Sequence, residues 1–310
     1  MDKTVITDFV DGITIKMCSP KTIFTLTRMK KIILTVGTLL AIMSASYAQS
    51  NVILTNSVTG NGNTTSIQQT IQAAFGFNNN ASITVLGNDN TAMLKQDGGG
   101  LVSTTTQSGN DNQSDVSQMG SYSANSVFQT GTNDGKNVSV VISDGQGIVS
   151  QVHQQADGAG SSNNMKLSQT GNNSYAGSQQ YATNRGVNSI DWEQTDNFMG
   201  IGSQANLLQV ADGAGSTNTL IGSQAIGFAE GYATAEFTQT ATNGGANVAL
   251  VLQPSIFSAV YGEQTADGTG SSNFASIDQS GDIEEFDFMQ TAMAGGTNEA
   301  QVLQYGFLDF

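Results

Sequence analysis

Basic residues, cysteine, proline and long apolar runs are all scarce in this sequence. Its 310 residues include 10 Lys and Arg, one Cys and two Pro, against 25 Asp and Glu, which gives a formal net charge of −15 at pH 7. Such an acidic chain has no electrostatic attraction for nucleic acid or for anionic membrane surfaces, and we therefore exclude both as partners. Beyond the N-terminal region, no stretch has the roughly 18–20 apolar residues of a membrane-spanning helix, so the exported chain is not expected to span a membrane.

The N-terminal region has the pattern of a secretory signal peptide at residues 29–48. A charged start at Met29 is followed by an apolar run and then by small residues up to Ala48, after which we expect cleavage. We interpret residues 1–28 as an over-extended N-terminus upstream of the true start. The exported chain then spans residues 49–310.

The expected cleavage changes the composition of the chain. It removes the only cysteine, Cys18, so disulfides cannot hold the exported protein together. It leaves four basic residues against 22 acidic ones, a formal charge near −18, which favours solubility before any assembly. The surplus of Gly, Asn, Gln, Ser and Thr is also compatible with disorder on composition alone, but the periodicity of the sequence argues against it.

Seven-residue segments that begin with Asn or Ser and end with Gln recur throughout the exported chain. Counting degenerate copies, there are about 20 of them. We expect their terminal residues to form structural ladders, and the well-formed copies supply the candidate site residues, which are Asn90, Gln96, Asn112, Gln118, Ser123, Gln129, Asn163, Gln169, Ser174, Gln180, Asn188, Gln194, Asn218, Gln224, Asn247, Gln253, Ser258, Gln264, Asn273, Gln279, Asn298 and Gln304.

Residue types alternate with a period of two inside each segment, which is the pattern of a β-strand. In the segment Asn188–Gln194, the Asn and the Gln lie at the two ends of an apolar face that also holds Ile190 and Trp192. Buried amides are costly unless they are hydrogen-bonded. Gln stacked over Gln at the strand spacing of about 4.8 Å meets this need, because each amide donates to the next one in a ladder.

The spacing of the closing glutamines predicts two alternating kinds of turn. From Gln154 onward, every second spacing is 14 or 15 residues, whereas the others are 11 or 15. Asp-Gly turns at Asp157, Asp212 and Asp267 recur every 55 residues, which corresponds to two coils, and they alternate on one side with turns such as Gln129–Asn137. We therefore predict an all-β fold, a β-solenoid of about ten two-stranded coils after the signal peptide. No coil can bury its own face, so stability must come from its neighbours.

The two strands Asn112–Gln118 and Ser123–Gln129, joined by the short turn MGSY, resemble the curlin repeat. That repeat builds the major and minor subunits of curli, which are secreted bacterial amyloid fibres, and the resemblance covers essentially all of residues 50–306. It implies a secreted, extracellular or cell-surface fibre subunit with roles in cell adhesion, surface colonisation and biofilm matrix. It implies as partners other copies of the same chain and a curli-type secretion and nucleation machinery.

The two ends of the predicted solenoid have no covering element in the sequence. The first strand, Val52–Val58, and the final residues, Gln304–Phe310, would leave exposed sheet edges, which natural monomers normally block. The sequence therefore favours a chain that polymerises end to end as a structural subunit of a curli-like fibre. A fibre nucleator, a stand-alone secreted adhesin and an ice-binding or glycan-binding solenoid remain alternatives, and a polysaccharide-cleaving β-helix is a further one.

We expect no catalytic residue, cofactor or metal site. The single histidine, His153, lies by alternation on an outward face and has no partner for metal or triad chemistry. Asp157, Asp212 and Asp267 are interpreted as turn formers, because calcium sites in repeat proteins need several Asp at short spacing. The acidic cluster at residues 282–287 is interpreted as solubilising charge.

Overall fold

A computed structural model of the chain describes residues 9–10, 13–14, 52–71, 77–171, 174–196, 203–226, 233–252, 258–268, 271–279, 284–293 and 296–304. The signal peptide expected at residues 29–48 lies outside these ranges, as does Gln253. The chain divides into two compact units, Met1–Gln49 and Ser50–Phe310. The described residues form no helix, so this part of the chain contains no helix that could cross a membrane.

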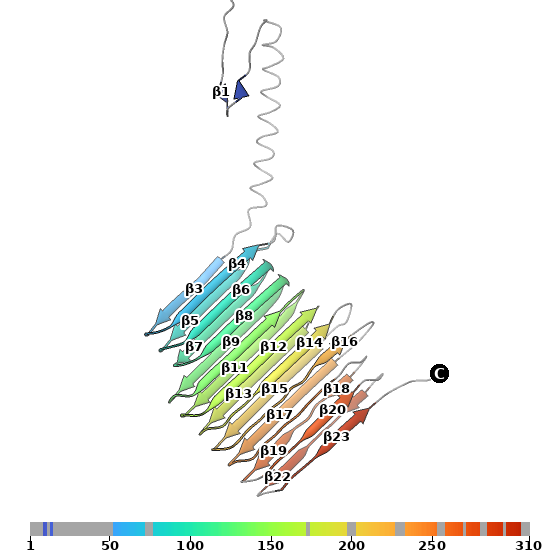
Figure 1. The fold of residues 1–310 in the computed structure, drawn as a ribbon. Helices are drawn as coiled ribbons and strands as arrows, with labels where there is room; N and C mark the ends of the chain where they lie inside the picture. Colours follow the sequence, from blue (N-terminus) through green and yellow to red (C-terminus); the bar gives the residue numbers. More distant parts are fainter. Residues whose placement is uncertain are drawn as a thin grey trace, which may run out of the picture. The chain divides into compact units, whose positions relative to one another are not determined.

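In the first unit, the described residues form two short antiparallel strands, β1 (Phe9–Val10) and β2 (Ile13–Thr14). The second unit is a β-solenoid of stacked parallel strands, as the sequence predicts (Figure 1). Its strands alternate between two sheets, so that two successive strands make one coil.

The first of these sheets, sheet I, contains eight long strands in a row and then two levels at which each strand is split in two. The eight are β3 (Val52–Thr59), β5 (Asn80–Leu86), β7 (Val102–Gly109), β9 (Ser123–Thr132), β11 (Ile148–Asp157), β13 (Ser174–Thr183), β15 (Ser203–Asp212) and β17 (Ala233–Thr242). The split levels are β18 (Ser258–Val260) with β19 (Gln264–Asp267), and β21 (Glu284–Phe286) with β22 (Gln290–Met293).

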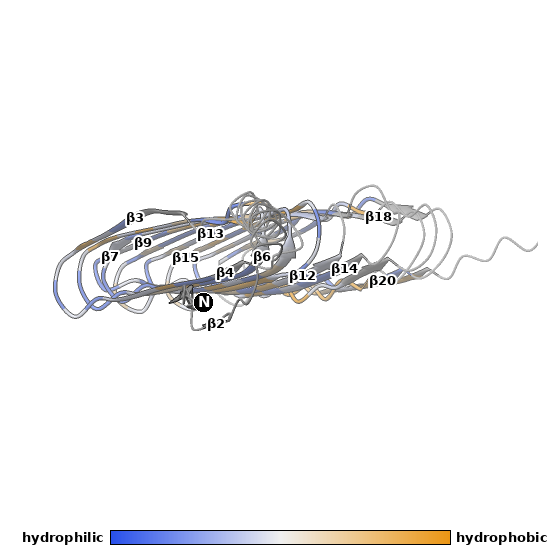
Figure 2. Cartoon of the chain, turned by 90° about the horizontal axis from the view of Figure 1, so that it is seen from above, coloured by the Kyte–Doolittle hydropathy of each residue, from blue (hydrophilic) through white to orange (hydrophobic). Residues whose placement is uncertain are grey.

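The opposite sheet, sheet II, faces sheet I as a second layer (Figure 2). Its strands are β4 (Thr64–Ile71), β6 (Thr91–Gly99), β8 (Gln113–Ser121), β10 (Lys136–Ser143), β12 (Ser162–Gly171), β14 (Ile190–Asp196), β16 (Gln224–Ile226), β20 (Ala275–Gln279) and β23 (Ala300–Gln304). Isolated parallel bridges connect β14 to β20 through Leu220 and Ala249, and a further bridge joins Leu252 to β20.

The strand boundaries differ from the sequence expectation in two respects. In β6 and β8 the strand begins after the Asn and continues past the Gln: β6 starts at Thr91 and runs three residues beyond Gln96. Asn90 instead ends the turn, where its amide donates to the carbonyl of Gly109 in the next coil. The expected strands Asn218–Gln224 and Asn247–Gln253 are reduced to single bridges over most of their length.

The inward positions of both sheets form an apolar core between the layers, in two clusters: a small one in β5 and β6 and a larger one from β8 onward. Large and small residues alternate along this core. Trp192 is fully buried, and the register that pairs Gln194 with Gln224 places Gly222 against its ring. A Cβ on Gly222 would lie 1.9 Å from Trp192 Cε3, so only glycine fits there.

Sheet I has a second example of this arrangement. Phe237 is buried, and a Cβ on Gly262, at the same inward position one coil later, would lie 2.9 Å from its Cζ. Sequence reasoning treated glycine only as a turn former and missed both core glycines. The signal that identifies them is the closing Gln two residues later, since it places each Gly on the inward face.

Candidate assembly surface

The closing glutamines of sheet I are buried and form a hydrogen-bonded ladder through the solenoid. Gln107 Nε2 donates to Gln129 Oε1 (2.8 Å), and Gln129 Nε2 donates to Gln154 Oε1 (2.8 Å). The ladder continues through Gln154 to Gln180 (2.7 Å) and Gln180 to Gln209 (3.1 Å). In the last coils the donors point the other way, from Gln290 to Gln264 (3.0 Å) and from Gln264 to Gln239 (2.7 Å).

All of these sheet I ladder glutamines except Gln209 also tie the two sheets together. Besides its partner in the neighbouring coil, Gln154 Nε2 donates to the backbone carbonyl of Val138 in sheet II (2.8 Å). The same bond to a carbonyl 16 residues earlier recurs at Gln107, Gln129, Gln180 and Gln264. Both amide protons of these side chains are thus used, which is the condition for burying them.

Sheet II has a shorter glutamine ladder because Ser143 occupies one of its positions. Gln69 Nε2 donates to Gln96 (2.8 Å) and Gln96 Nε2 donates to Gln118 (2.8 Å). Gln118 Nε2 then donates to Ser123 Oγ instead of to a further glutamine. Ser123 Oγ lies 3.0 Å from Ser143 Oγ. Beyond this interruption, Gln194 Nε2 donates to Gln169 Oε1 (3.0 Å).

The asparagines that begin the sheet II segments form a third ladder. Asn112, Asn137 and Asn163 each donate to the Asn of the preceding coil, over 2.9, 2.6 and 2.7 Å. From Asn188 onward each Asn donates to the following one, in the order Asn188, Asn218, Asn247, Asn273 and Asn298, over 2.5–2.7 Å. Sequence reasoning did not include Asn137, although it lies six residues before Ser143, as each Asn does before its Gln.

Two of the ladders reverse direction inside the solenoid. Asn163 Oδ1 and Asn188 Oδ1 belong to neighbouring coils, and both are buried without a hydrogen-bond partner among the described residues. Gln209 Nε2 likewise lacks one where the sheet I ladder reverses, and Gln239 Nε2 donates to the Thr219 carbonyl instead. Buried unpaired polar atoms are costly, so these coils are bonded less strongly than their neighbours.

The remaining candidate residues are placed as follows. Gln279 is buried and donates to the carbonyl of Ala259 (3.0 Å). Ser123 and Ser174 are buried at the start of sheet I strands, but Ile148 lies between them in register, so they form no polar ladder there. The side chains of Gln224, Ser258 and Gln304 lie outside the described part of the structure, although their backbones are in strands.

The turns that connect sheet I to sheet II form a stack of their own. Thr132 Oγ1 and Asn133 Nδ2 both donate to Asp157 Oδ1, over 2.6 and 2.7 Å, and the hydrogen bonds from Thr132 and then Asn133 lower the pKa of Asp157 below its ordinary value. Thr183 and Asn184 do the same to Asp212 in the next pair of coils. The two kinds of turn therefore alternate on one side, as the 55-residue period predicts.

Both ends of the solenoid leave the core positions of the last coil partly open. Ile67 in β4 is half-buried, whereas Leu94, its register partner in β6, is 2 % exposed. At the opposite end, Val302 in β23 is half-buried, whereas its partner Ile277 in β20 is 2 % exposed. Among the described strands, β4 pairs only with β6, and β23 pairs only with β20. These two ends form the candidate assembly surface (Figure 1).

No group of three or more His, Cys, Asp or Glu with the geometry of a metal site occurs within the described residues. His153 lies on the outer face of sheet I, half-buried, with its ring 5.6 Å from that of Tyr181 in an edge-to-face arrangement. In the acidic cluster, Asp287 is exposed beside the buried Phe288, whereas Asp282 lies outside the described residues.

Comparison with known proteins gives one family. Residues 75–98 and 87–120 match the model of the curlin associated repeat. These residues contain β5, β6, β7 and most of β8, and thus the ladder positions Asn90, Gln96, Asn112 and Gln118. No curated protein and no solved structure matches the chain. The curlin associated repeat is thus matched over part of the chain, within the β-solenoid.

Proposed function

We propose that this chain has a structural function: it is a secreted subunit that polymerises end to end into an extracellular, curli-like amyloid fibre. The match to the curlin associated repeat and the β-solenoid fold support this proposal. The observation that carries this proposal is the pair of open ends, where core positions such as Ile67 and Val302 are half-buried in the last coil and their register partners are not.

The open ends favour stacking because they repeat the cross-section of the interior. Among the described strands, each end presents an edge in both sheets that pairs with no further strand, which is a template for another strand. Asn298 is half-buried at one end, whereas Asn273 in the coil before it is fully buried, so a further coil would continue the ladder as well as the core. A second copy of the chain supplies such a coil.

The match to the curlin associated repeat supports extending the proposal to a wider role. A fibre of this kind at the cell surface serves adhesion and biofilm formation, and its secretion and nucleation require dedicated machinery. The chain then works through repeated buried amides and apolar side chains, and no enzymatic step is part of the proposal.

The test is seeded assembly of the purified exported chain, residues 49–310. We expect a lag phase that preformed fibres abolish, thioflavin fluorescence, and fibre diffraction near 4.7 and about 10 Å, the spacings of stacked strands and packed sheets. A folded, soluble monomer that never seeds would contradict the proposal and favour a stand-alone binding solenoid.

Matched lysine variants test whether the ends are the contact surfaces. Ile67→Lys and Val302→Lys place a charge on the inward face of each terminal coil, and we expect both to stop elongation. Ser66→Lys and Leu303→Lys add the same charge to the outward face of the same strands and should assemble at the parental rate. Equal effects of inward and outward lysines would exclude the ends as the assembly surface.

A further inference from the structure

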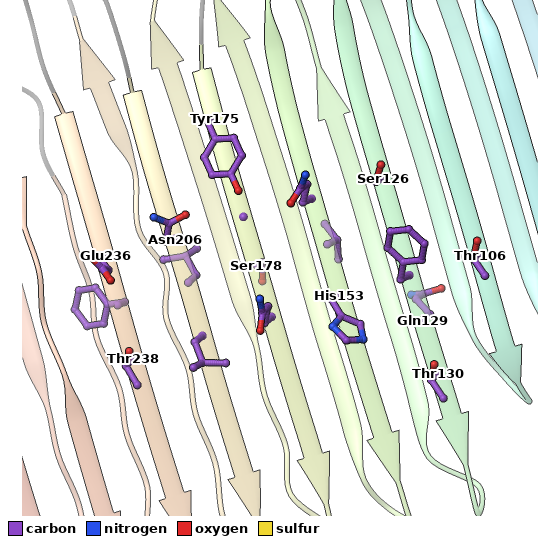
Figure 3. A pocket seen from close by; sticks show the side chains of 18 of the residues that line it. Thr106, Ser126, Gln129, Thr130, His153, Tyr175, Ser178, Asn206, Glu236 and Thr238 are labelled. Carbon is purple, nitrogen blue, oxygen red and sulfur yellow. The ribbon is translucent and has the colours of Figure 1, made fainter.

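The outer surface of sheet I carries a groove of about 840 Å³, away from the two ends (Figure 3). Residues from six consecutive strands of the sheet, β7, β9, β11, β13, β15 and β17, line it. The groove therefore crosses the strands and runs along the stacking direction. Five strand spacings of about 4.8 Å make it about 24 Å long, which suits an extended chain laid across the sheet.

The strand register shows how the groove is built. Its floor is a row of small, polar or acidic side chains in register, one from each of β9, β11, β13, β15 and β17, namely Ser126, Gln151, Gly177, Asn206 and Glu236. The neighbouring row, two residues further along each strand, begins with Phe128, which is 45 % exposed, and His153. Tyr175 lies on the other side of the floor.

Gly177 makes room for the ring of Tyr175. A Cβ on Gly177 would lie 3.1 Å from Tyr175 Oη and 3.7 Å from Cε1, so the tyrosine lies along its own strand over the glycine. Figure 3 looks onto the outer surface and shows this ring nearly face-on. Tyr175 thus presents a flat aromatic face to solvent, within a groove that also holds amide side chains.

The charge distribution separates this face from the opposite one. On β5 to β17, the outward positions of sheet I hold no Lys or Arg, and their acidic residues are Asp157 and Asp212 at the strand ends and Glu236 on the groove floor. The outward positions of sheet II on β6 to β14 hold charged residues on every strand, including the ion pair Lys166–Asp191 (3.4 Å). In a chain of net charge −15, a surface this low in charge points to an uncharged ligand.

We propose that this groove binds a neutral, linear polysaccharide. Sugar rings have apolar C–H faces that stack on aromatic rings such as Tyr175, and hydroxyls that both donate to and accept from amides such as Gln151 and Asn206. A β-linked hexose chain rises by about one strand spacing per residue, so successive sugars would meet successive strands of the floor.

A second copy of this chain is the competing occupant. Packing another sheet against the groove would bury Gln151 and Gln179, both exposed, against a surface without matching partners. The uneven relief, with Gly177 between larger side chains, also lacks the flat complementarity of a dry sheet-on-sheet contact. Sugar hydroxyls satisfy the amides, whereas a second sheet face does not.

The experiment measures retardation of the purified protein in native gels that contain hydroxyethylcellulose, together with binding to microcrystalline cellulose. We expect retardation that soluble cello-oligosaccharides compete away, and no retardation by the anionic polymer alginate. Tyr175→Ala should weaken binding about tenfold, by loss of the stacking face. Phe274→Ala removes a half-buried aromatic from the outer face of sheet II and should leave binding unchanged.

Gln151→Glu provides a second variant, because it changes only the charge of an exposed side chain on the groove floor. It should reduce retardation while the thermal unfolding temperature stays at the parental value. The proposal is overturned if cellulose and hydroxyethylcellulose fail to bind the parent, or if Tyr175→Ala and Phe274→Ala bind equally. It is also overturned if Tyr175→Ala instead abolishes lateral bundling of fibres without glycan, which would assign the face to a second copy. Seeded elongation should be unaffected by either groove variant, so failure here leaves end-to-end assembly untouched.

Discussion

Thr132 and Asp157 are 25 residues apart in the sequence, yet Thr132 Oγ1 donates a 2.6 Å hydrogen bond to Asp157 Oδ1 across two adjacent coils. The contact recurs between Thr183 and Asp212 (2.6 Å) and, more loosely, between Thr242 and Asp267 (3.1 Å). This contact therefore occurs once in every two coils, and two coils are the 55-residue unit of the sequence.

These aspartates predict an acid-dependent loss of stability. Hydrogen bonds from Thr132 and Asn133 lower the pKa of Asp157, and those from Thr183 and Asn184 lower the pKa of Asp212. A carboxyl with a lowered pKa in the folded state stabilises the fold above its unfolded value of about 3.8, and this contribution is lost as the pH falls through the folded value. The thermal unfolding temperature of the parent should therefore decrease as the pH falls below about 3.8.

The double variant Asp157→Asn, Asp212→Asn should lose less stability than the parent when the pH is lowered, so its unfolding temperature should depend less on acid pH. At neutral pH it should be slightly less stable than the parent. Glu193→Gln, an exposed carboxyl on the outer face of sheet II, is the matched control and should keep the parental profile. If the double variant and the control lost the same amount of stability at acid pH, the hydrogen bonds to Asp157 and Asp212 would not be the cause of the acid-dependent loss.

Truncation of a ladder glutamine should be strongly destabilising. Gln154→Ala removes two buried hydrogen bonds, to Gln129 and Gln180, and a partly buried one to the Val138 carbonyl, and it leaves a cavity. We expect the free energy of unfolding to fall by about 3 kcal/mol, measured by denaturant unfolding. Gln151→Ala, at an exposed position of the same strand, should stay within about 0.5 kcal/mol of the parent. Similar losses for both variants would show that the ladder contributes little.

Extending the sheet I ladder should stabilise the N-terminal coils. Val85 is buried next to Gln107, whose Oε1 is buried without a hydrogen-bond partner among the described residues. Val85→Gln would offer this oxygen a donor, and we expect the free energy of unfolding to rise by about 1 kcal/mol. Val85→Ala is the comparison and should be destabilising. If the Val85→Gln variant were less stable than Val85→Ala, a glutamine at position 85 would not extend the sheet I ladder.

Gly222→Ala should disrupt the core beside Trp192. The added methyl would overlap the indole ring, and Gly222 has φ +107°, which alanine adopts only with strain. We expect the overlap and the strain together to lower the free energy of unfolding by about 2–4 kcal/mol, measured by thermal or denaturant unfolding.

Gly215→Ala separates the two causes. Gly215 has φ +84° in a turn of the same coil, but its nearest heavy atom would lie 3.7 Å from the new Cβ, so only the backbone strain applies. It should cost less than Gly222→Ala, and Trp192→Leu should partly rescue the Gly222 variant. Absence of any rescue would mean that the ring overlap is not the cause.

The repeat itself determined most of the fold. Period-two alternation between Asn and Gln identifies strands and their inward faces without any structure, because side chains alternate across a strand. The 55-residue recurrence of Asp157, Asp212 and Asp267 identifies two-coil units and the side on which their turns lie. Burial of Gln and Asn could also be inferred, since only a stack of identical side chains makes buried amides tolerable.

Only the tertiary structure decided which contacts each repeat makes with its neighbours. The donor direction of Asn163 and Asn188 depends on the whole ladder, and the close fit of Gly222 to Trp192 depends on residues 30 positions apart. The same is true of the groove beside Tyr175, where six strands contribute side chains that are distant in sequence. Periodicity fixes the orientation of each side chain relative to its own strand, whereas register and packing between coils determine what it touches.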